Sequence, residues 1–382
     1  MDPIENPYAP GAGTRPPELA GRDEILEKAR ILLGRIRKGS QEKSIILVGL
    51  RGVGKTALLN RISDMAEDAG YRSIMIEAPE NKSLPDLLVP PLRRLLLSLD
   101  HSAKVRKGLA ALVGFIRAFN VKVGDIEVSM QPGVADSGDL EADLCDLLVA
   151  AAEAAAERHQ AIALIIDELQ YLKEVEMSAL IMALHKIAQR DLPLVLIGAG
   201  LPQIVGLAGK SKSYAERLFE YPQVGALSFN DASLAIVIPA ERKGVRYELD
   251  ALSMIYDHSI GYPYFLQEWG YHVWNTASTS LIGTTTVERA TESVIRKLDE
   301  NFFRVRFDRL TPKEKEYLFA MAALGEGPHR SGDISARLNR AVESVAPIRN
   351  SLIRKGMIFS PAHGDTAFTV PLFDQYLRRV HG

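Results

Sequence analysis

A glycine-rich octapeptide carries the clearest chemical signal in this 382-residue chain. Residues 49–56 read Gly-Leu-Arg-Gly-Val-Gly-Lys-Thr, which fits the pattern G-x-x-x-x-G-K-[ST] of a phosphate-binding loop. The apolar run 44–48 before it predicts a buried strand, and residues 56–62 begin a helical pattern. A strand, a glycine-rich turn and a helix N-terminus gather backbone N–H groups around one point, which favours an anion there.

The loop predicts a site for ATP or ADP, and each of its characteristic residue types has a separate role in binding the nucleotide. The glycines let the backbone approach phosphates without a clash from a Cβ atom. Lys55 is expected to bond the β- and γ-phosphates, and Thr56 to hold Mg²⁺ through its hydroxyl. The predicted nucleotide-binding residues of the loop are Gly49, Leu50, Arg51, Gly52, Val53, Gly54, Lys55, Thr56 and Ala57.

A second pattern consists of the apolar run 162–166 followed by Asp167 and Glu168. The run predicts a strand buried in a parallel sheet, which delivers both acids to the edge where the phosphate loop opens. Asp167 is then expected to bind Mg²⁺, and Glu168 to orient and deprotonate an attacking water. The alternative interpretation is an acidic turn that only caps a helix.

The composition is that of an ordinary globular protein, with 47% hydrophobic residues and a net charge of −2. With no global basic field, any contact with DNA needs a local patch. The single cysteine, Cys145, excludes a disulfide framework and a multi-cysteine zinc site. Residues 1–17 lack an apolar signal core, and the apolar runs are too short to span a membrane. These features predict a cytoplasmic protein without membrane contact.

Strand and helix patterns alternate along the first part of the chain, which predicts an α/β fold with a parallel sheet. We expect strands at 44–48, 71–77, 161–166, 194–197 and 224–229, and a hairpin at 121–128. From residue 231 to about 310 the signal is helical. The predicted parts are an N-terminal arm at 1–18, an ATPase domain at 19–229, a helical lid at 230–305 and a C-terminal domain at 306–382.

The C-terminal part predicts a winged helix, because three helical patterns precede two short strand patterns around a polar turn. The third helix, at 342–355, would be the recognition helix. Its candidate contacts to duplex DNA are Arg349, Asn350, Arg354 and Lys355. Acidic residues are interspersed, whereas a DNA reader usually shows a clearer basic stripe.

The order of four segments resembles the AAA+/STAND ATPases, relatives of the archaeal and eukaryotic origin-recognition initiators. The segments are residues 19–22, the loop 49–56, Asp167 with Glu168, and residues 261–263, and the resemblance covers about 19–300. It implies an AAA+-like P-loop sheet with a helical lid. It also implies that Gly21 and Arg22 pack by the adenine and that Pro263 covers it. A helix-to-helix turn is the alternative for Pro263.

The resemblance extends to two further features. Residues 214–219 resemble the segment that carries a trans arginine finger, which makes Arg217 a candidate catalytic residue in an oligomer; a solvated or ion-paired arginine is the alternative. The family usually has a polar side chain after the strand at 194–197, where this chain has Gly198-Ala199-Gly200, and an arginine on the lid helix, where residues 264–268 offer none. Slow turnover is therefore expected.

Together these patterns predict an ATP-binding regulatory ATPase, in which hydrolysis at Glu168 resets a conformational switch between the ATPase and the winged helix. A protein partner is expected, but its identity is not indicated. In STAND proteins the winged helix often packs against the ATPase and reports its nucleotide state. A DNA-binding, initiator-like AAA+ ATPase and a non-hydrolysing, nucleotide-dependent adaptor are the two alternatives.

Overall fold

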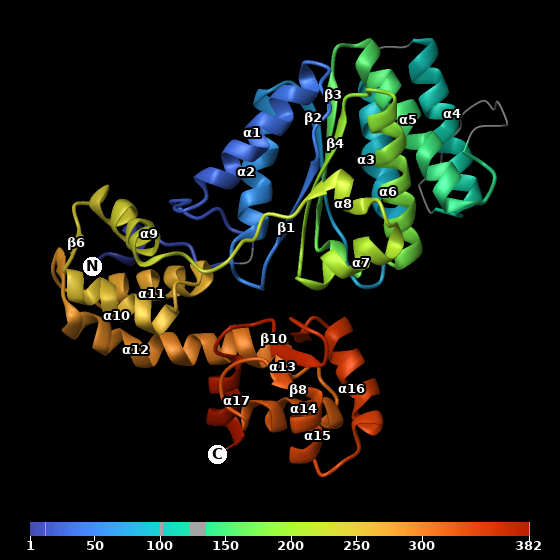
Figure 1. The fold of residues 1–382 in the computed structure, drawn as a ribbon. Coiled ribbons are helices and arrows are strands. Elements are labelled where there is room, and N and C mark those ends of the chain that lie inside the picture. The colour runs from blue at the N-terminus through green and yellow to red at the C-terminus, as the bar shows by residue number, and fades with distance from the viewer. Residues whose placement is uncertain (12, 100–101, 122–134, 382) are drawn as a thin grey trace. The chain divides into compact units, whose positions relative to one another are not determined.

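The computed structural model describes residues 1–11, 13–99, 102–121 and 135–381 (Figure 1). The hairpin predicted at 121–128 lies outside the described residues, except for its first residue. The chain divides into two compact units. The sheet unit contains residues 23–49 and 58–223, and the lid unit contains residues 1–22, 50–57 and 224–382. The boundaries of the four predicted parts stay a prediction.

The sheet unit is built on five parallel strands in the order β2-β3-β4-β1-β5. Every residue of β1, β3 and β4 is buried, as expected for strands covered on both faces. The parallel sheet is the one predicted from the apolar runs. The strands are β1 Ser44–Val48, β2 Tyr71–Glu77, β3 Ala161–Asp167, β4 Leu194–Gly200 and β5 Phe219–Glu220.

Helices cover both faces of this sheet (Figure 1). α1 and α2 lie on one face and α3, α5 and α6 on the other, while α4 packs against α3 and α5. The alanine-rich α5 packs closely on α6 because its side chains are small. The helices are α1 Asp23–Arg37, α2 Lys55–Asp68, α3 Leu84–Ser98, α4 Ala103–Ala118, α5 Leu140–Glu157, η2 Leu169–Tyr171, α6 Glu174–Gln189, α7 Gln203–Ser211 and α8 Ala215–Leu218.

The strand predicted at 224–229 is wrong. The fifth strand is β5, which pairs with Ser44 and Ile45 of β1. Residues 224–228 instead form a loop whose polar backbone groups bond elsewhere: the Leu227 N–H donates to the Gly261 carbonyl at 2.8 Å. The apolar pattern continues into the next helix, and that continuity produced the mistaken strand.

The lid unit contains a helical part with a core that includes Phe265, Trp269 and Phe303. Two short parallel strands, β6 and β7, join its helices. The helical signal predicted from residue 231 is confirmed. The elements are η1 Pro3–Glu5, α9 Phe229–Glu241, β6 Arg246–Tyr247, α10 Leu249–Ser259, α11 Pro263–Thr276, β7 Leu281–Ile282, α12 Thr284–Leu298, the π-helix η3 Asp299–Phe303 and α13 Arg304–Phe307.

The C-terminal part follows in the same unit and combines helices with an antiparallel sheet of order β8-β10-β9, whose strand β8 lies between the first and second helix. The helices and the hairpin predicted there are present, and the winged-helix assignment stays an interpretation. The elements are α14 Pro312–Ala322, β8 His329–Arg330, α15 Ser331–Arg337, α16 Val342–Arg354, β9 Ile358–Phe359, β10 Asp365–Phe368 and α17 Phe373–His381.

The N-terminal arm is packed against the lid helices. Tyr8 is only 3% exposed, and its hydroxyl donates to the Ile236 carbonyl at 2.7 Å. Gly270 leaves room for the ring, since a Cβ there would lie 2.7 Å from Tyr8 Cδ1. The sequence indicated an extended arm but not this docking. Over the described ranges, no helix is long and apolar enough to cross a membrane.

Candidate nucleotide site

The glycine-rich loop has the geometry that an anion cradle needs. β1 ends at Val48 and α2 begins at Lys55, so the loop runs from the strand directly into a helix N-terminus. Gly52 and Gly54 have φ angles of 83° and 89°, in the left-handed region that side chains disfavour. Backbone N–H groups at a helix N-terminus form a ready site for a phosphate.

Lys55 lies inside this loop and is only 7% exposed. Its Nζ donates a hydrogen bond of 2.8 Å to the Leu50 carbonyl oxygen. A neutral carbonyl is a weaker acceptor for an ammonium than a phosphate oxygen is, because hydrogen bonds between charged partners are roughly twice as strong. A phosphate oxygen would thus be a stronger partner than this carbonyl, and contact of Lys55 with a phosphate stays a prediction. Thr56 follows Lys55 at the first turn of α2.

The loop is also bonded to other parts of the lid unit. The Tyr264 N–H at the start of α11 donates to the Gly52 carbonyl at 3.1 Å. The Arg51 N–H donates to the Thr369 carbonyl at 3.1 Å, and Arg51 Nε donates to the Gly356 carbonyl at 3.3 Å. Thr369 is fully buried. The resemblance implied that the winged helix packs against the ATPase, but no pattern in the sequence indicated these particular bonds to the phosphate loop.

Gly21 and Arg22 join the same loop from the N-terminal side. Arg22 Nη2 donates to the Val53 carbonyl at 3.3 Å and to the Gly225 carbonyl at 2.6 Å. Burial lowers the pKa of Arg22, and the nearby Asp231 carboxylate opposes that shift. Gly21 has φ 66°, and a Cβ there would lie 2.7 Å from Asp231 Cγ. These bonds hold the 19–22 segment beside the loop, and contact with an adenine stays a prediction.

Residues 261–263 form a tight entry into α11. Gly261 has φ 69°, and a Cβ on it would overlap the Leu227 carbonyl oxygen. Tyr262 occupies the N-cap position, and Pro263 is the first residue of α11. Proline suits that position because its φ is already helical and its missing N–H has no partner to lose. The helix-turn interpretation is thus satisfied, and cover of the adenine by Pro263 stays a prediction.

In the sheet unit, Asp167 and Glu168 end β3. Asp167 is 5% exposed, and its Oδ1 accepts the Glu168 N–H at 2.8 Å. Glu168 has φ 56° and ψ 38°, a left-handed conformation that is unusual for a side chain other than glycine. Since β1 and β3 are parallel in one sheet, their carboxyl ends lie at the same edge, and the phosphate loop follows β1 in the chain.

Gln170 is a neighbour of Glu168 that the sequence did not single out. Its Nε2 donates to Glu168 Oε2, and its Oε1 accepts the Leu201 N–H at 3.0 Å. Gly200, at the end of β4, leaves room for it, because a Cβ there would lie 3.0 Å from Gln170 Oε1. The end of β4, where the sequence shows only small residues, therefore meets a polar side chain from the η2 turn that follows β3.

The residues suit a magnesium ion that arrives with a nucleotide. Within the described part of the chain, no group of three or more His, Cys, Asp or Glu side chains could hold a metal by itself. Mg²⁺ typically uses one or two protein oxygens, waters and the substrate phosphates. A buried carboxylate at Asp167 and the Thr56 hydroxyl fit that donor set, and their role as ligands stays a prediction.

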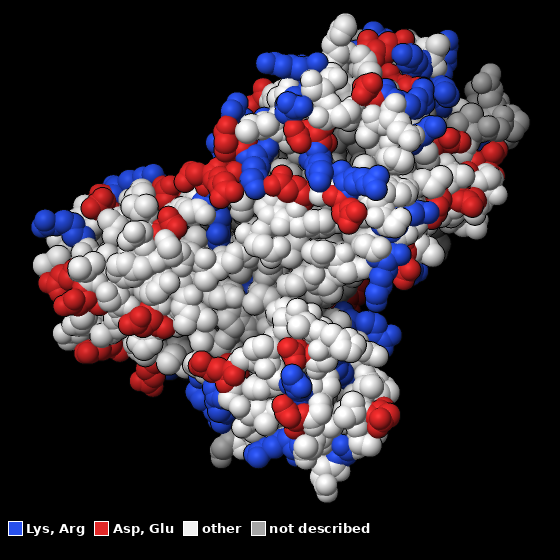
Figure 2. Space-filling model, viewed as in Figure 1, with Lys and Arg blue, Asp and Glu red and all other residues white. Residues whose placement is uncertain are grey.

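The remaining predicted residues have different surroundings. Arg217 is exposed in the short α8, and its role as a finger is untested. On α16, Arg349 Nε donates to Thr366 Oγ1 at 2.9 Å, and Lys355 Nζ donates to Glu314 Oε2 at 2.8 Å. Asn350 and Arg354 are exposed. The face in Figure 2 shows acidic and basic side chains interspersed over the C-terminal part.

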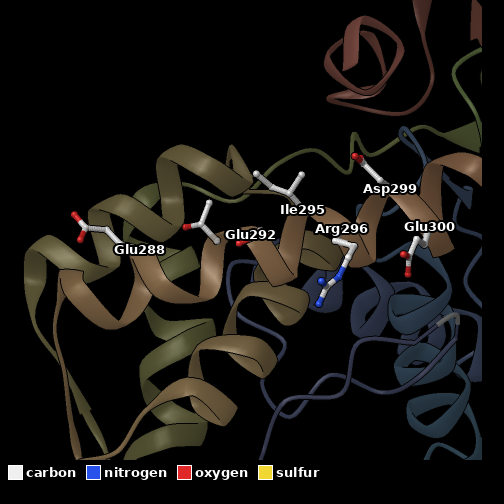
Figure 3. A pocket seen from close by; sticks show the side chains of 7 residues that line it. Glu288, Glu292, Ile295, Arg296, Asp299 and Glu300 are labelled. Carbon is white, nitrogen blue, oxygen red and sulfur yellow. The ribbon is translucent and has the colours of Figure 1, made fainter. Parts of the chain in front are cut away.

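A surface hollow of about 670 Å³ runs along α12 and η3 (Figure 3). Its carboxylates repel phosphate, which makes it unsuitable for a nucleotide. It is lined by Glu288, Thr291, Glu292, Ile295, Arg296, Asp299 and Glu300.

Known families match two parts of the sequence. Residues 18–197 match the AAA ATPase domain, and residues 300–377 match a domain of unknown function (DUF8462). No curated protein matches the sequence significantly.

Solved structures are similar over nearly the whole chain. The Walker-type ATPase PABY2304 of Pyrococcus abyssi has a TM-score of 0.57 at 16% identity, over 96% of this chain and 97% of that one. The Orc1 protein of Aeropyrum pernix in complex with DNA has 0.49 at 15%, over 97% and 94%. The RuvB Holliday junction branch migration motor of Thermotoga maritima has 0.48 at 16%, over 96% and 99%.

The predicted AAA+ P-loop fold is confirmed by the family match, by the five-stranded parallel sheet and by the likeness to PABY2304. The match of residues 18–197 to the AAA ATPase domain supports nucleotide-dependent ATPase chemistry in general.

Proposed function

We propose that this chain is an ATP-binding regulatory ATPase that works as a slow nucleotide-dependent conformational switch. The observation that carries the proposal is the bonding of the phosphate loop to two other parts of the lid unit. Tyr264 of α11 bonds the Gly52 carbonyl, and the Thr369 carbonyl bonds the Arg51 N–H. A conformational change of the loop on nucleotide binding would therefore alter hydrogen bonds to the lid helix and to the C-terminal hairpin directly.

The chain's own residues would perform the hydrolysis as follows. Lys55 would leave the Leu50 carbonyl for a phosphate oxygen. Thr56 and Asp167 would hold Mg²⁺, which would supply positive charge to the phosphates. Glu168 takes a proton from water as the water oxygen bonds the γ-phosphorus. The bond from that phosphorus to the bridging oxygen breaks, and ADP leaves with the electron pair. ADP and inorganic phosphate are the products.

The energy available to such a switch follows from the bonds. A hydrogen bond contributes about 1 kcal/mol net. Gly52 makes one to the lid helix, and Arg51 makes two to the C-terminal hairpin, one from its backbone and one from its side chain. A few kcal/mol is enough to shift a two-state equilibrium on the order of a hundredfold. The switch requires only that these hydrogen bonds be more stable when one of the two nucleotides, ATP or ADP, is bound than when the other is.

Hydrogen exchange in the two nucleotide states tests the proposal. The Glu168→Gln variant should bind ATP without hydrolysing it, since an amide cannot accept the water's proton. We expect amide exchange in residues 261–268 and 356–372 to differ between this ATP-bound variant and the ADP-bound protein. Peptides from α5 serve as the internal control. Equal exchange in both states would overturn the switch.

Turnover assays separate this proposal from the alternatives. Tight nucleotide binding without any hydrolysis in the unmodified protein would identify the adaptor. Stimulation by duplex DNA would favour the initiator-like alternative. For a monomeric switch we expect the rate per subunit to be independent of protein concentration. A rate that rises with concentration and flattens in Arg217→Ala would instead assign Arg217 as a trans finger.

A further inference from the structure

The turn after β3 fits into space that two glycines of β4 leave open. A Cβ on Gly198 would overlap Leu169, and one on Gly200 would lie 3.0 Å from Gln170 Oε1. Gly198 and Gly200 thus admit the η2 turn against the end of the neighbouring strand. All of these residues belong to the sheet unit.

The orientation of the Gln170 amide is determined by its partners. The Leu201 N–H lies 3.0 Å from Oε1, and a backbone donor can pair only with the oxygen of an amide. The NH₂ group must therefore face the other way, toward Glu168, whose carboxylate oxygen Oε2 accepts from it. The peptide after β4 consequently sets which end of Gln170 meets the carboxylate.

Glu168 is held at its backbone as well. Its N–H donates to Asp167 Oδ1 at 2.8 Å, and its left-handed φ of 56° persists in a half-buried turn. Residues kept in such conformations cluster at functional sites, because the surrounding structure must hold them there. The bond to Asp167 holds the backbone of Glu168, and the bond from the Gln170 amide holds the carboxylate of Glu168.

We propose that Gln170 is a positioning residue for ATP hydrolysis, which orients the Glu168 carboxylate and ties its position to the end of β4. The proposal rests on the proposed function, because it assigns Glu168 as the base. Gln170 Nε2 bonds one carboxylate oxygen, and the other oxygen receives the proton of the attacking water. This residue supplies the polar contact that Gly198, Ala199 and Gly200 cannot.

Steady-state hydrolysis, with ATP affinity measured separately, tests this role. Gln170→Ala should lower kcat roughly 10- to 100-fold, since a displacement of about 1 Å of a catalytic group costs up to about a hundredfold. KM and affinity should stay within about twofold. Gln189→Ala on α6, an exposed glutamine, is the matched control and should behave like the unmodified protein.

A second variant excludes a merely structural role. Gln170→Glu keeps the length of the side chain and an acceptor for the Leu201 N–H, but places a second carboxylate against Glu168. When two carboxylates lie next to each other, repulsion between their charges raises the pKa of the pair. Its loss of kcat should exceed that of Gln170→Ala at neutral pH, and its pH–rate profile should move to higher pH. Gln170→Ala added to Glu168→Gln should leave the small residual rate of Glu168→Gln unchanged, because the two residues act as a unit.

The outcomes are distinct. A normal kcat in Gln170→Ala, or losses that simply multiply in the double variant, would overturn the inference and leave the proposed function intact. An unmodified protein that binds ATP and never hydrolyses it would overturn the proposed function, and this inference with it.

Discussion

Two lysines that the sequence put forward as ligand contacts, Lys55 and Lys355, lie in opposite chemical situations. Lys55 is buried in the phosphate loop and donates to a main-chain carbonyl, that of Leu50, at 2.8 Å. Lys355 follows α16 and donates to the carboxylate of Glu314, also at 2.8 Å. Lys55 begins a helix and follows two glycines with positive φ, a backbone arrangement that favours an anion. Lys355 would have to leave the buried Glu314 carboxylate to reach a ligand.

The arginines of α16 reinforce the difference. Arg349 bonds the Thr366 hydroxyl and the Asp365 carbonyl, so it fastens α16 to β10. Asn350 and Arg354 are the exposed members of the predicted DNA contact. A cluster of basic residues in a sequence thus indicates a ligand surface only when the residues lack stronger partners in their own domain.

The largest expected effect is on Lys55. Lys55→Ala should weaken ADP and ATP binding at least about a hundredfold, since a hydrogen bond to a charged group contributes about 1.5–3 kcal/mol and the phosphate charge is left uncompensated. Calorimetry measures the affinity. Arg61→Ala, an exposed position on the same helix, is the matched control. Unchanged affinity in Lys55→Ala would remove the nucleotide assignment.

The second prediction concerns Glu314 and acid. Burial opposes ionisation of Glu314, but hydrogen bonds from Lys355, the Thr311 N–H and Ser351 outweigh it and lower its pKa to about 2. A lowered pKa contributes stability above the unfolded value of 4.5, which is lost as the pH falls toward 2. We expect Lys355→Met to destabilise the C-terminal part by about 2 kcal/mol at neutral pH.

Urea unfolding at several pH values measures this. In Lys355→Met the loss of stability on acidification should still begin near the unfolded pKa of 4.5, but it should be smaller and end at a higher pH, because the folded pKa of Glu314 is then less depressed. Exposed Arg354→Met is the control and should leave both the stability and its pH dependence unchanged. If Lys355→Met were as stable as the parent, the contrast with Lys55 would fail, and Lys355 would be available to a ligand.

Much of the sheet and the phosphate loop could be predicted, because their chemistry demands particular residue types at particular spacings. Only glycine adopts the φ of 83° at Gly52 readily, and only a run such as β3 tolerates burial on both faces. The strand proposed at 224–229 failed because an apolar run fits a loop, a strand and the start of a helix equally well. Its backbone partner, Gly261, is distant in sequence.

The functional contacts that were missed depend on conformation or on long-range pairing. Gln170 reaches Glu168 only because Glu168 adopts a left-handed turn, which no pattern in the sequence requires. Arg51 meets Thr369 across most of the chain, and Lys355 meets Glu314 across the C-terminal part. A motif indicates which residues bind a ligand, but it does not indicate which residues elsewhere in the chain hold those binding residues in position.

The smallest expected effect concerns Pro263. Its ring fixes the first turn of α11, whose next residue, Tyr264, donates its N–H to the Gly52 carbonyl. Loss of the fixed φ increases the freedom of this turn and should cost about 0.4–1 kcal/mol. Pro263→Ala should therefore lower the melting temperature of the nucleotide-free protein only slightly, as the loss of any proline from a first helix turn does. Beyond that loss it should weaken ADP affinity about two- to fivefold.

Pro312 offers the matched control, since it is also the first residue of a helix, α14, in the same unit. Pro312→Ala should lower the melting temperature slightly and equally with and without ADP. Stabilisation by ADP grows as RT ln(1 + [L]/Kd), about 2.7 kcal/mol at a hundredfold excess over Kd, so a selective loss is measurable by thermal unfolding. If Pro263→Ala behaved like Pro312→Ala, residues 261–263 would be only a helix turn. Coupling of the lid to the nucleotide would then have to act through the bonds of Arg51.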